Sequence, residues 1–228
     1  MNQDRLAKLD AMMAGRLVVS CQPIDDGPLD SDEIVGRFAM AAVLGGAGAV
    51  RIEGADRVAA VRPFVTVPLI GIVKYDLDDS PVRITPFASD VAALIAAGAD
   101  IVAVDATCRV RPEPLADLLA AIRAGGAWAM ADCSGEEDAL AAADMGFDII
   151  GTTLSGYTGG PVPAEPDYAL VRSLAARLPR VMAEGRIHTP KQVTLAREAG
   201  AWAVTVGTAI TRTELVTQWF AEAMAAAS

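Results

Sequence analysis

Eight short apolar runs, separated by stretches of helical composition, constrain the fold of this chain more than any other feature. The runs span residues 17–22, 49–52, 68–74, 100–107, 127–133, 148–153, 180–185 and 202–211. Each run is almost continuously apolar, as expected for a strand that is covered on both faces. The last distinctive residues of successive runs lie 20 to 32 residues apart, which is about one strand–helix unit. Eight such units in series predict a closed parallel (β/α)8 barrel of the TIM type rather than an open sheet.

The segments between these runs are rich in alanine and carry helix signals. Helices are expected at 112–124, 136–145, 190–199 and, at the C-terminal end, 215–227. Capping boxes are predicted for Ser134 with Glu137, Thr189 with Gln192, and Thr211 with Glu214. Helix ends are predicted at Gly98, Gly146 and Gly200. Two polar loops, 75–88 and 155–166, interrupt the pattern, and we expect both to be functional.

Composition limits the class of protein further. With 53% hydrophobic residues and no linker-like stretch, the 228 residues are expected to form a single barrel domain, 1–228. The net charge of −10 argues against a nucleic-acid partner, and an anionic ligand would need local dipoles and a few placed cations. No apolar run reaches membrane-spanning length and the N-terminus does not resemble a signal peptide, so we expect a cytoplasmic protein without a membrane partner.

Metal and redox sites are not indicated by the sequence. The three cysteines, Cys21, Cys108 and Cys133, form no Cys-x-x-Cys pair, so neither a disulfide framework nor a zinc cluster is expected. His188 is the only histidine and is expected at the surface. We therefore predict no metal and no cofactor.

Polar residues close six of the apolar runs. They are Gln22, Arg51, Lys74, Asp105, Asp132 and Glu184. In a barrel the carboxyl ends of the strands share one face, so these side chains are expected to surround one pocket. The alternative is a structural ion-pair network in the barrel mouth, because charges that close buried strands are costly unless they are paired.

Each of these charged residues has a catalytic and a structural interpretation. Lys74 suits a base or a Schiff-base nucleophile, or it is neutralised by Asp105 or Asp132. Glu184 suits a general acid or base, or it pairs with Lys74 or Arg51. The two aspartates could orient substrate hydroxyls or tune Lys74, whereas Gln22 and Arg51 could donate to substrate oxygens. For Arg51, an ion pair with Glu53 or Asp56 is the structural alternative.

A phosphate site is predicted where the seventh and eighth runs end. Backbone N–H groups of two glycine turns and a following helix N-terminus would form the cradle found in phosphate-binding barrels. The residues expected to form it are Gly185, Arg186, Gly207, Thr208 and Arg212. Glycines also serve plain tight turns, which is the structural alternative. Tyr157, in the second loop, is expected to cover the ligand or to be an exposed, mobile side chain.

Several motifs, taken in order, resemble the N-acylmannosamine-6-phosphate 2-epimerase family, from about Gly15 to the C-terminus. They are VSCQ (19–22), PLIGIVK (68–74), DATCRVRP (105–112), MADC (130–133), GFDIIGTTLSGYT (146–158), AEG (183–185) and GTAITR (207–212). The resemblance implies a barrel of the ribulose-phosphate-binding type. It also implies that N-acetylmannosamine 6-phosphate is converted to N-acetylglucosamine 6-phosphate in sialic acid and amino-sugar catabolism, without a cofactor.

The resemblance assigns roles residue by residue. It implies that Lys74 and Glu184 are the catalytic pair. Contacts to the substrate would come from Gln22, Arg51 and Asp132, and contacts to the phosphate from Gly185, Gly207 and Arg212. The chain departs from the family pattern at Tyr75 and Thr208, where many members have Arg and Gly, and its loop after GYT is shorter.

An enolate route fits these residues. The proton on C2 of the open-chain sugar is acidic because C2 adjoins the C1 aldehyde, so its removal and return to the opposite face inverts C2. Rival interpretations are a Schiff-base aldolase or another phosphosugar-barrel lyase, a non-catalytic phosphosugar-binding barrel, and a barrel of tryptophan or thiamine biosynthesis. The alanine-rich segment 215–227 could supply the face of a homodimer.

Overall fold

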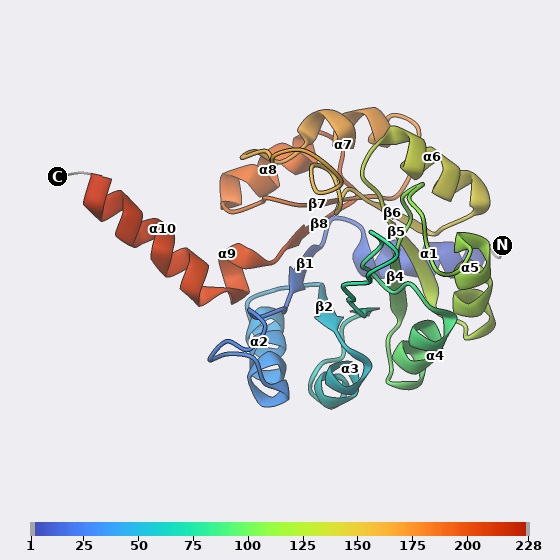
Figure 1. Ribbon diagram of the computed structural model, residues 1–228, viewed down its shortest axis with the longest axis horizontal. Helices are drawn as coiled ribbons and strands as arrows, with labels where there is room; N and C mark the ends of the chain where they lie inside the picture. Colours follow the sequence, from blue (N-terminus) through green and yellow to red (C-terminus); the bar gives the residue numbers. More distant parts are fainter. Residues whose placement is uncertain (1–2, 227–228) are drawn as a thin grey trace.

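The chain forms a closed barrel of eight parallel strands with helices on the outside (Figure 1). The computed structural model describes residues 3–226. The strands are β1 (Leu17–Ser20), β2 (Ala49–Glu53), β3 (Leu69–Ile72), β4 (Ile101–Asp105), β5 (Trp128–Asp132), β6 (Ile149–Gly151), β7 (Val181–Glu184) and β8 (Ala203–Val206). They are hydrogen-bonded in sequence order, and β8 closes the ring on β1 with Leu17 opposite Val204. The predicted (β/α)8 barrel is confirmed.

Helices follow each strand, and α2 to α8 cover the outside of the barrel (Figure 1). They are α1 (Gln3–Met13), α2 (Asp32–Leu44), α3 (Ala55–Val61), α4 (Ala88–Ala96), α5 (Leu115–Ala124), α6 (Glu136–Met145), α7 (Tyr168–Ala175), α8 (Pro190–Glu198), α9 (Thr208–Thr211) and α10 (Thr213–Ala226), with a short 3-10 turn at Arg62–Phe64. All eight apolar runs contain a strand. The last run was predicted too long, because residues 208–211 form α9 instead of continuing β8.

One end of the barrel is closed by the N-terminal helix. Leu9 and Met13 of α1 are fully buried, in one apolar cluster with residues from all eight strands, such as Met130 and Met182. Asp10 accepts hydrogen bonds from Arg180, at 2.6 and 2.8 Å. The packing of α1 on the strand interior leaves the other end, where the strands terminate, as the place for a site.

The predicted helix signals were partly right. Thr189 and Gln192 form a capping box at α8, and Gly146 ends α6 in the left-handed conformation with φ 104°. The box predicted for Ser134 is wrong, because Gly135 is the cap residue and Ser134 donates to Asp138 at 2.5 Å. The box predicted for Thr211 is also wrong, since Thr211 ends α9 and its hydroxyl donates to the backbone of β1.

Helix α10 projects away from the barrel (Figure 1). None of its residues is buried, and Phe220 and Met224 are 73% and 76% exposed. The helix expected at 215–227 therefore exists, although residue 227 lies outside the described residues. Over residues 3–226, no helix combines the length and the hydropathy that a bilayer crossing needs.

Candidate active site

A cavity of about 390 Å³ opens at the carboxyl ends of the strands. Its lining contains Gln22, Arg51, Lys74, Tyr157, Glu184, Gly185, Arg186, Gly207, Thr208 and Arg212, together with Ser20, Pro81, Arg83, Ile84, Arg109, Thr153, Leu154, Ile187, His188 and Thr205. All the residues that the sequence predicts for the site therefore lie around one cavity, except Asp105 and Asp132. The predicted convergence of strand ends from remote parts of the chain is what the barrel produces.

Lys74 and Glu184 reach this cavity from opposite sides. Lys74 comes two residues after β3 and Glu184 ends β7, and these strands lie four apart in a ring of eight. The Lys74 ammonium donates to Glu53 Oε2 at 2.8 Å and to Gln22 Oε1 at 2.5 Å. The partner of Lys74 is thus neither Asp105 nor Asp132, the two partners considered from the sequence.

Arg51 lies beneath the cavity and joins two carboxylates. Its side chain is 1% exposed, and it donates to Asp132 Oδ2 at 2.7 Å and to Glu184 Oε2 at 2.8 Å. The expected alternative partners of Arg51, Glu53 and Asp56, are not its ion-pair partners. A buried ion-pair network and an open cavity therefore occur together, because Glu184 belongs to both.

Burial governs the titration of this network. Glu184 has its pKa raised above the ordinary value, chiefly because burial disfavours the carboxylate and Asp132 adds a second negative charge, while Arg51 opposes the rise. Burial disfavours the charge of Arg51 as well, but Asp132 and Glu184 more than compensate and raise its pKa. Glu184 is thus a carboxyl group that can exchange a proton nearer to neutral pH than an exposed glutamate can.

The turns after β7 and β8, where the sequence predicts a phosphate site, line one end of the cavity. Gly185 has φ 113° and Gly207 precedes the single turn of α9. A Cβ on Gly207 would lie 3.2 Å from Ser20 Cβ, so the backbone approaches β1 closely there. Arg212 donates through Nε to the Gln22 carbonyl at 2.9 Å, which holds its guanidinium at the rim.

The Arg186 side chain has a structural task at this end. Its guanidinium donates to the carbonyls of Glu165, at 2.8 Å, and Ser155, and lies 5.4 Å from the centre of the Tyr157 ring. These contacts tie the loop at 155–166 to the β7 turn. Arg186 itself lies in the turn after β7 with φ +58°, a conformation in which successive backbone N–H groups can face an anion.

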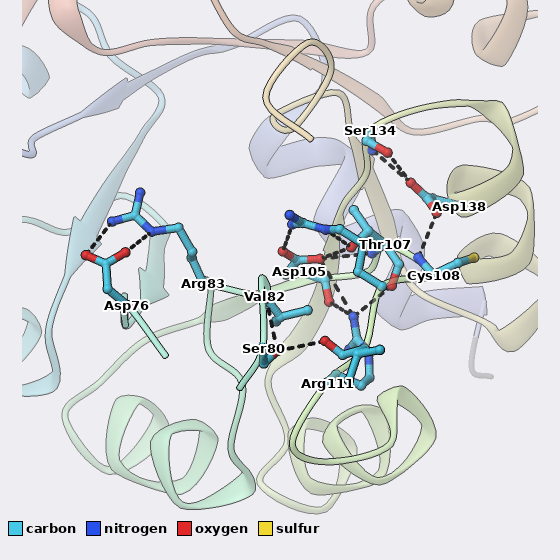
Figure 2. Close-up of polar contacts among 12 residues, drawn as sticks. Asp76, Ser80, Val82, Arg83, Asp105, Thr107, Cys108, Arg111, Ser134 and Asp138 are labelled. Atoms are coloured by element: carbon cyan, nitrogen blue, oxygen red, sulfur yellow. Dashed lines mark hydrogen bonds and ion pairs between the residues drawn. The ribbon is translucent and has the colours of Figure 1, made fainter. Parts of the chain in front are cut away.

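Asp132 and Asp105 support the site from behind. Both are fully buried, and neither lines the cavity. Asp132 accepts from Arg51 and from Thr153 Oγ1 at 2.5 Å. Asp105 accepts from Thr107 and Arg109, and its carbonyl accepts from Arg111 (Figure 2).

Sequence reasoning missed several lining residues. His188, which was expected at the surface, is partly exposed, lines the cavity and packs on Trp219 of α10, with ring centres 4.6 Å apart. Arg83 and Arg109 were not singled out, although Arg83 lies in a loop that was expected to be functional and Arg109 lies in the DATCRVRP motif. Both could have been found from the sequence, because each is a basic residue in a loop that follows a barrel strand.

The cavity lining is cationic, in contrast to the chain as a whole. Five arginines and Lys74 line it, against a net charge of −10 for the chain. Among residues 3–226, no group of three or more His, Cys, Asp or Glu side chains is arranged to hold a metal ion. The fold and the site define the class of (β/α)8-barrel enzymes, here with a cavity whose cationic lining suits a small anionic ligand.

Comparison with known proteins shows to which family of barrel enzymes the chain belongs. Residues 35–226 match the family model of the N-acetylmannosamine-6-phosphate epimerases, NanE. Relatives that carry the name N-acetylmannosamine-6-phosphate 2-epimerase are 56% identical in Photobacterium profundum, over 96% of this chain and 93% of the relative, and 57% identical in Shigella sonnei, over 96% of both. The chain belongs to the N-acetylmannosamine-6-phosphate epimerase family.

Solved structures agree with this placement. The N-acetylmannosamine-6-phosphate 2-epimerase from Clostridium perfringens is 39% identical, with a TM-score of 0.90 over 94% of this chain and 95% of that chain. A thiamine phosphate pyrophosphorylase from Pyrococcus furiosus is 17% identical, with a TM-score of 0.63 over 90% and 91%. The second likeness concerns the fold alone, so it gives no support to the thiamine alternative.

Proposed function

We propose that this protein inverts C2 of N-acetylmannosamine 6-phosphate to give N-acetylglucosamine 6-phosphate. The observation that carries the proposal is the placement of Lys74 and Glu184 on opposite sides of one cationic cavity. Inversion needs a group that removes a proton from one face of a carbon and a group that returns one to the other face. Two proton carriers on strands that face each other across the barrel supply this arrangement.

The resting charges of the pair suit such an exchange. Lys74 makes the contacts of an ammonium, to Glu53 and Gln22, and Glu184 accepts from Arg51 as a carboxylate. In one direction Glu184 takes the C2 proton, the C–H electrons form the C1–C2 double bond of an enolate, and Lys74 delivers a proton to the opposite face. The enzyme is then left with a neutral amine and a carboxylic acid, which is the state that runs the reverse reaction.

The substrate is held by the rest of the lining. The phosphate occupies the turns at Gly185 and Gly207, where backbone N–H groups and the Arg212 guanidinium donate to its oxygens. Arg51 and Gln22 lie nearer the centre and face the sugar chain, while Tyr157, 49% exposed at the rim, covers the ligand. Asp132 acts through Arg51, because its carboxylate lies behind that guanidinium.

The test is incubation of the wild-type protein with N-acetylmannosamine 6-phosphate in D2O, followed by NMR. The expected result is the C2 epimer with deuterium at C2. Absence of conversion would overturn the proposal. Cleavage of the sugar carbon chain, together with an imine on Lys74 that borohydride traps, would favour the Schiff-base aldolase instead. Binding of the sugar phosphate without exchange would favour a non-catalytic barrel.

A homodimer in the cytoplasm completes the proposal. A single helix of 14 residues is marginal in water, and α10 leaves Phe220 and Met224 exposed with no buried residue of its own. Packing α10 against a second copy would cover these side chains and fix the helix whose Trp219 contacts His188 at the cavity. The cytoplasmic setting fits three free cysteines, two of them buried.

A further inference from the structure

Arg109 reaches the cavity on a loop that is fixed from several sides. Thr107 and Asp105 hold the start of this loop, Asp138 of α6 accepts from the Cys108 N–H at 2.9 Å, and Ser80 donates to the Val110 carbonyl at 2.7 Å. Figure 2 shows these contacts converging from the loop after β3 and from α6. Hydrogen bonds from several elements therefore restrict the conformation of this loop.

The guanidinium of Arg109 is itself held in one orientation. Its Nη2 donates to Asp105 Oδ2 at 2.7 Å and its Nε donates to Thr107 Oγ1 at 2.9 Å. Thr107 Oγ1 in turn donates to Asp105 Oδ1 at 2.6 Å, so the aspartate and the threonine form one fully connected support. These contacts use two of the five guanidinium N–H groups, and the side chain, which lines the cavity, is 25% exposed.

The position of Arg109 in the ring indicates which end of the substrate it meets. Arg109 follows β4 and Gly207 follows β8, and these two strands lie four apart in the closed ring. A sugar phosphate whose phosphate lies in the Gly207 turn extends away from it, toward β3 and β4. The far end of an open-chain 6-phosphate carries C1 and C2, which brings the C1 oxygen to the side of the cavity where Lys74 and Arg109 lie.

We propose that Arg109 is a catalytic residue that stabilises the enolate oxygen on C1, with Asp105 and Thr107 as its positioning residues. This inference rests on the proposed function. When the C2 proton leaves, the electron pair moves through C1 and places negative charge on the C1 oxygen. A fixed guanidinium N–H donates a hydrogen bond to that oxygen without giving up its proton, which lowers the barrier as an oxyanion donor does.

The other lining cations are less suited to this task. Arg51 is bound to Asp132 and Glu184, and Arg186 and Arg212 follow β7 and β8, at the end of the cavity proposed for the phosphate. Arg83 pairs with Asp76 and its side chain is 56% exposed, so its charge is screened by solvent. Lys74 is needed for proton transfer. Arg109 combines a fixed orientation with open donors at the reacting end.

The test compares Arg109→Gln with the wild type by three measurements: deuterium exchange at C2, KM, and affinity for inorganic phosphate. We expect exchange and kcat to fall on the order of 10²- to 10³-fold, the usual cost of one oxyanion donor. KM and phosphate affinity should stay within about threefold, because the proposed contact forms in the transition state. Unchanged exchange, or a loss confined to KM or phosphate affinity, would overturn the assignment.

A matched pair of variants tests the positioning residue without removing the charge. Thr107→Val deletes the hydroxyl that holds Arg109 Nε, and Thr107→Ser keeps it. We expect the valine variant to lose roughly 10-fold in kcat, the effect of losing one hydrogen bond to a charged group, and the serine variant to stay near wild type. Equal activity of the two would contradict the positioning role, even if Arg109→Gln fails to fold.

Wild-type activity separates the two proposals. If the wild type does not epimerise the sugar phosphate, the proposed function fails and the role of Arg109 falls with it. If the wild type epimerises and Arg109→Gln matches it, the inference about Arg109 fails alone.

Discussion

Arg51 Nη1 lies 2.8 Å from Glu184 Oε2, and this contact joins the buried ion-pair network to the open cavity. The same guanidinium binds Asp132 at 2.7 Å, so a single cation compensates two carboxylates that would otherwise be buried together. The contact with Arg51 fixes Glu184 in place, but it does not fully offset burial and the charge of Asp132, so the pKa of Glu184 stays raised. The consequences can be measured in stability and in pH dependence.

The pH profile of the wild type should reflect the raised pKa of Glu184. If the reaction requires its carboxylate, kcat/KM falls as the pH drops through that pKa, and the acidic limb lies above about 4.3, the value of an unperturbed glutamate. Replacement of Arg51 by Lys weakens the interaction that opposes the rise, so the limb should move to higher pH. An acidic limb at the ordinary value, unmoved in Arg51→Lys, would contradict this assignment.

Removal of the Arg51 charge should destabilise the fold. Arg51→Met leaves Asp132 and Glu184 buried without their partner, which typically costs about 3–5 kcal/mol. Adding Asp132→Asn and Glu184→Gln should recover part of this loss, because neutral amides tolerate burial better than carboxylates. Denaturant unfolding near pH 7 measures both steps. A triple variant that is no more stable than Arg51→Met would show that packing, not charge, sets the cost.

The ion pair between Asp10 of α1 and Arg180, which precedes β7, should stabilise the fold to an extent that depends on pH. Hydrogen bonds from Arg180 lower the pKa of Asp10, with a further contribution from Trp202. A lowered folded-state pKa stabilises the protein above the unfolded value of about 3.9, and the gain is lost as the pH falls through the folded-state value. Asp10→Asn should therefore cost no more than about 1 kcal/mol at pH 7, since the carboxylate is 40% exposed, and less toward pH 3.

A double-mutant cycle with Arg180→Gln isolates this interaction. The coupling between the two substitutions should shrink as the pH falls from 7 to 3. A coupling that stays constant over this range would attribute the effect to packing of α1.

The dimer proposal makes a prediction about α10. Phe220→Glu together with Met224→Glu places charges on the exposed apolar surface and should convert a dimeric wild type to a monomer in light scattering. Gln218→Glu adds one negative charge at another exposed position of α10 and should leave the mass unchanged. A monomeric wild type, or a double variant that remains dimeric, would contradict the proposal that α10 forms the dimer interface.

The barrel was predictable from the sequence, but the pairing inside it was not. Continuous apolar runs specify buried parallel strands, and their regular spacing specifies the ring, so residues such as Lys74 and Glu184 could be placed at one mouth. Which acid meets which base depends on side-chain reach across the ring. Glu53 and Arg51 lie two residues apart on the same face of β2, yet Glu53 binds Lys74 whereas Arg51 binds Asp132 and Glu184.

The errors at helix ends have a similar origin. Ser134 and Thr211 have the residue types of capping boxes, but the Ser134 hydroxyl donates to Asp138 of the following helix, and the Thr211 hydroxyl donates to the distant Ser20 carbonyl. His188 became a cavity residue through its contact with Trp219, 31 positions later, which no local pattern encodes. Asp105 looked like a substrate ligand because it ends a strand, yet its carboxylate is used to hold the loop of Arg109.

The most direct measurement of the central claim is deuterium exchange and inversion at C2, followed by NMR from each epimer separately, in Lys74→Met and Glu184→Gln. With one proton carrier on each face, inversion should fall about 10²- to 10⁴-fold in both variants. Any exchange that remains should be confined to one epimer, and to a different epimer in each variant. Inversion at the wild-type rate in either variant, or undiminished exchange of both epimers, would contradict the account.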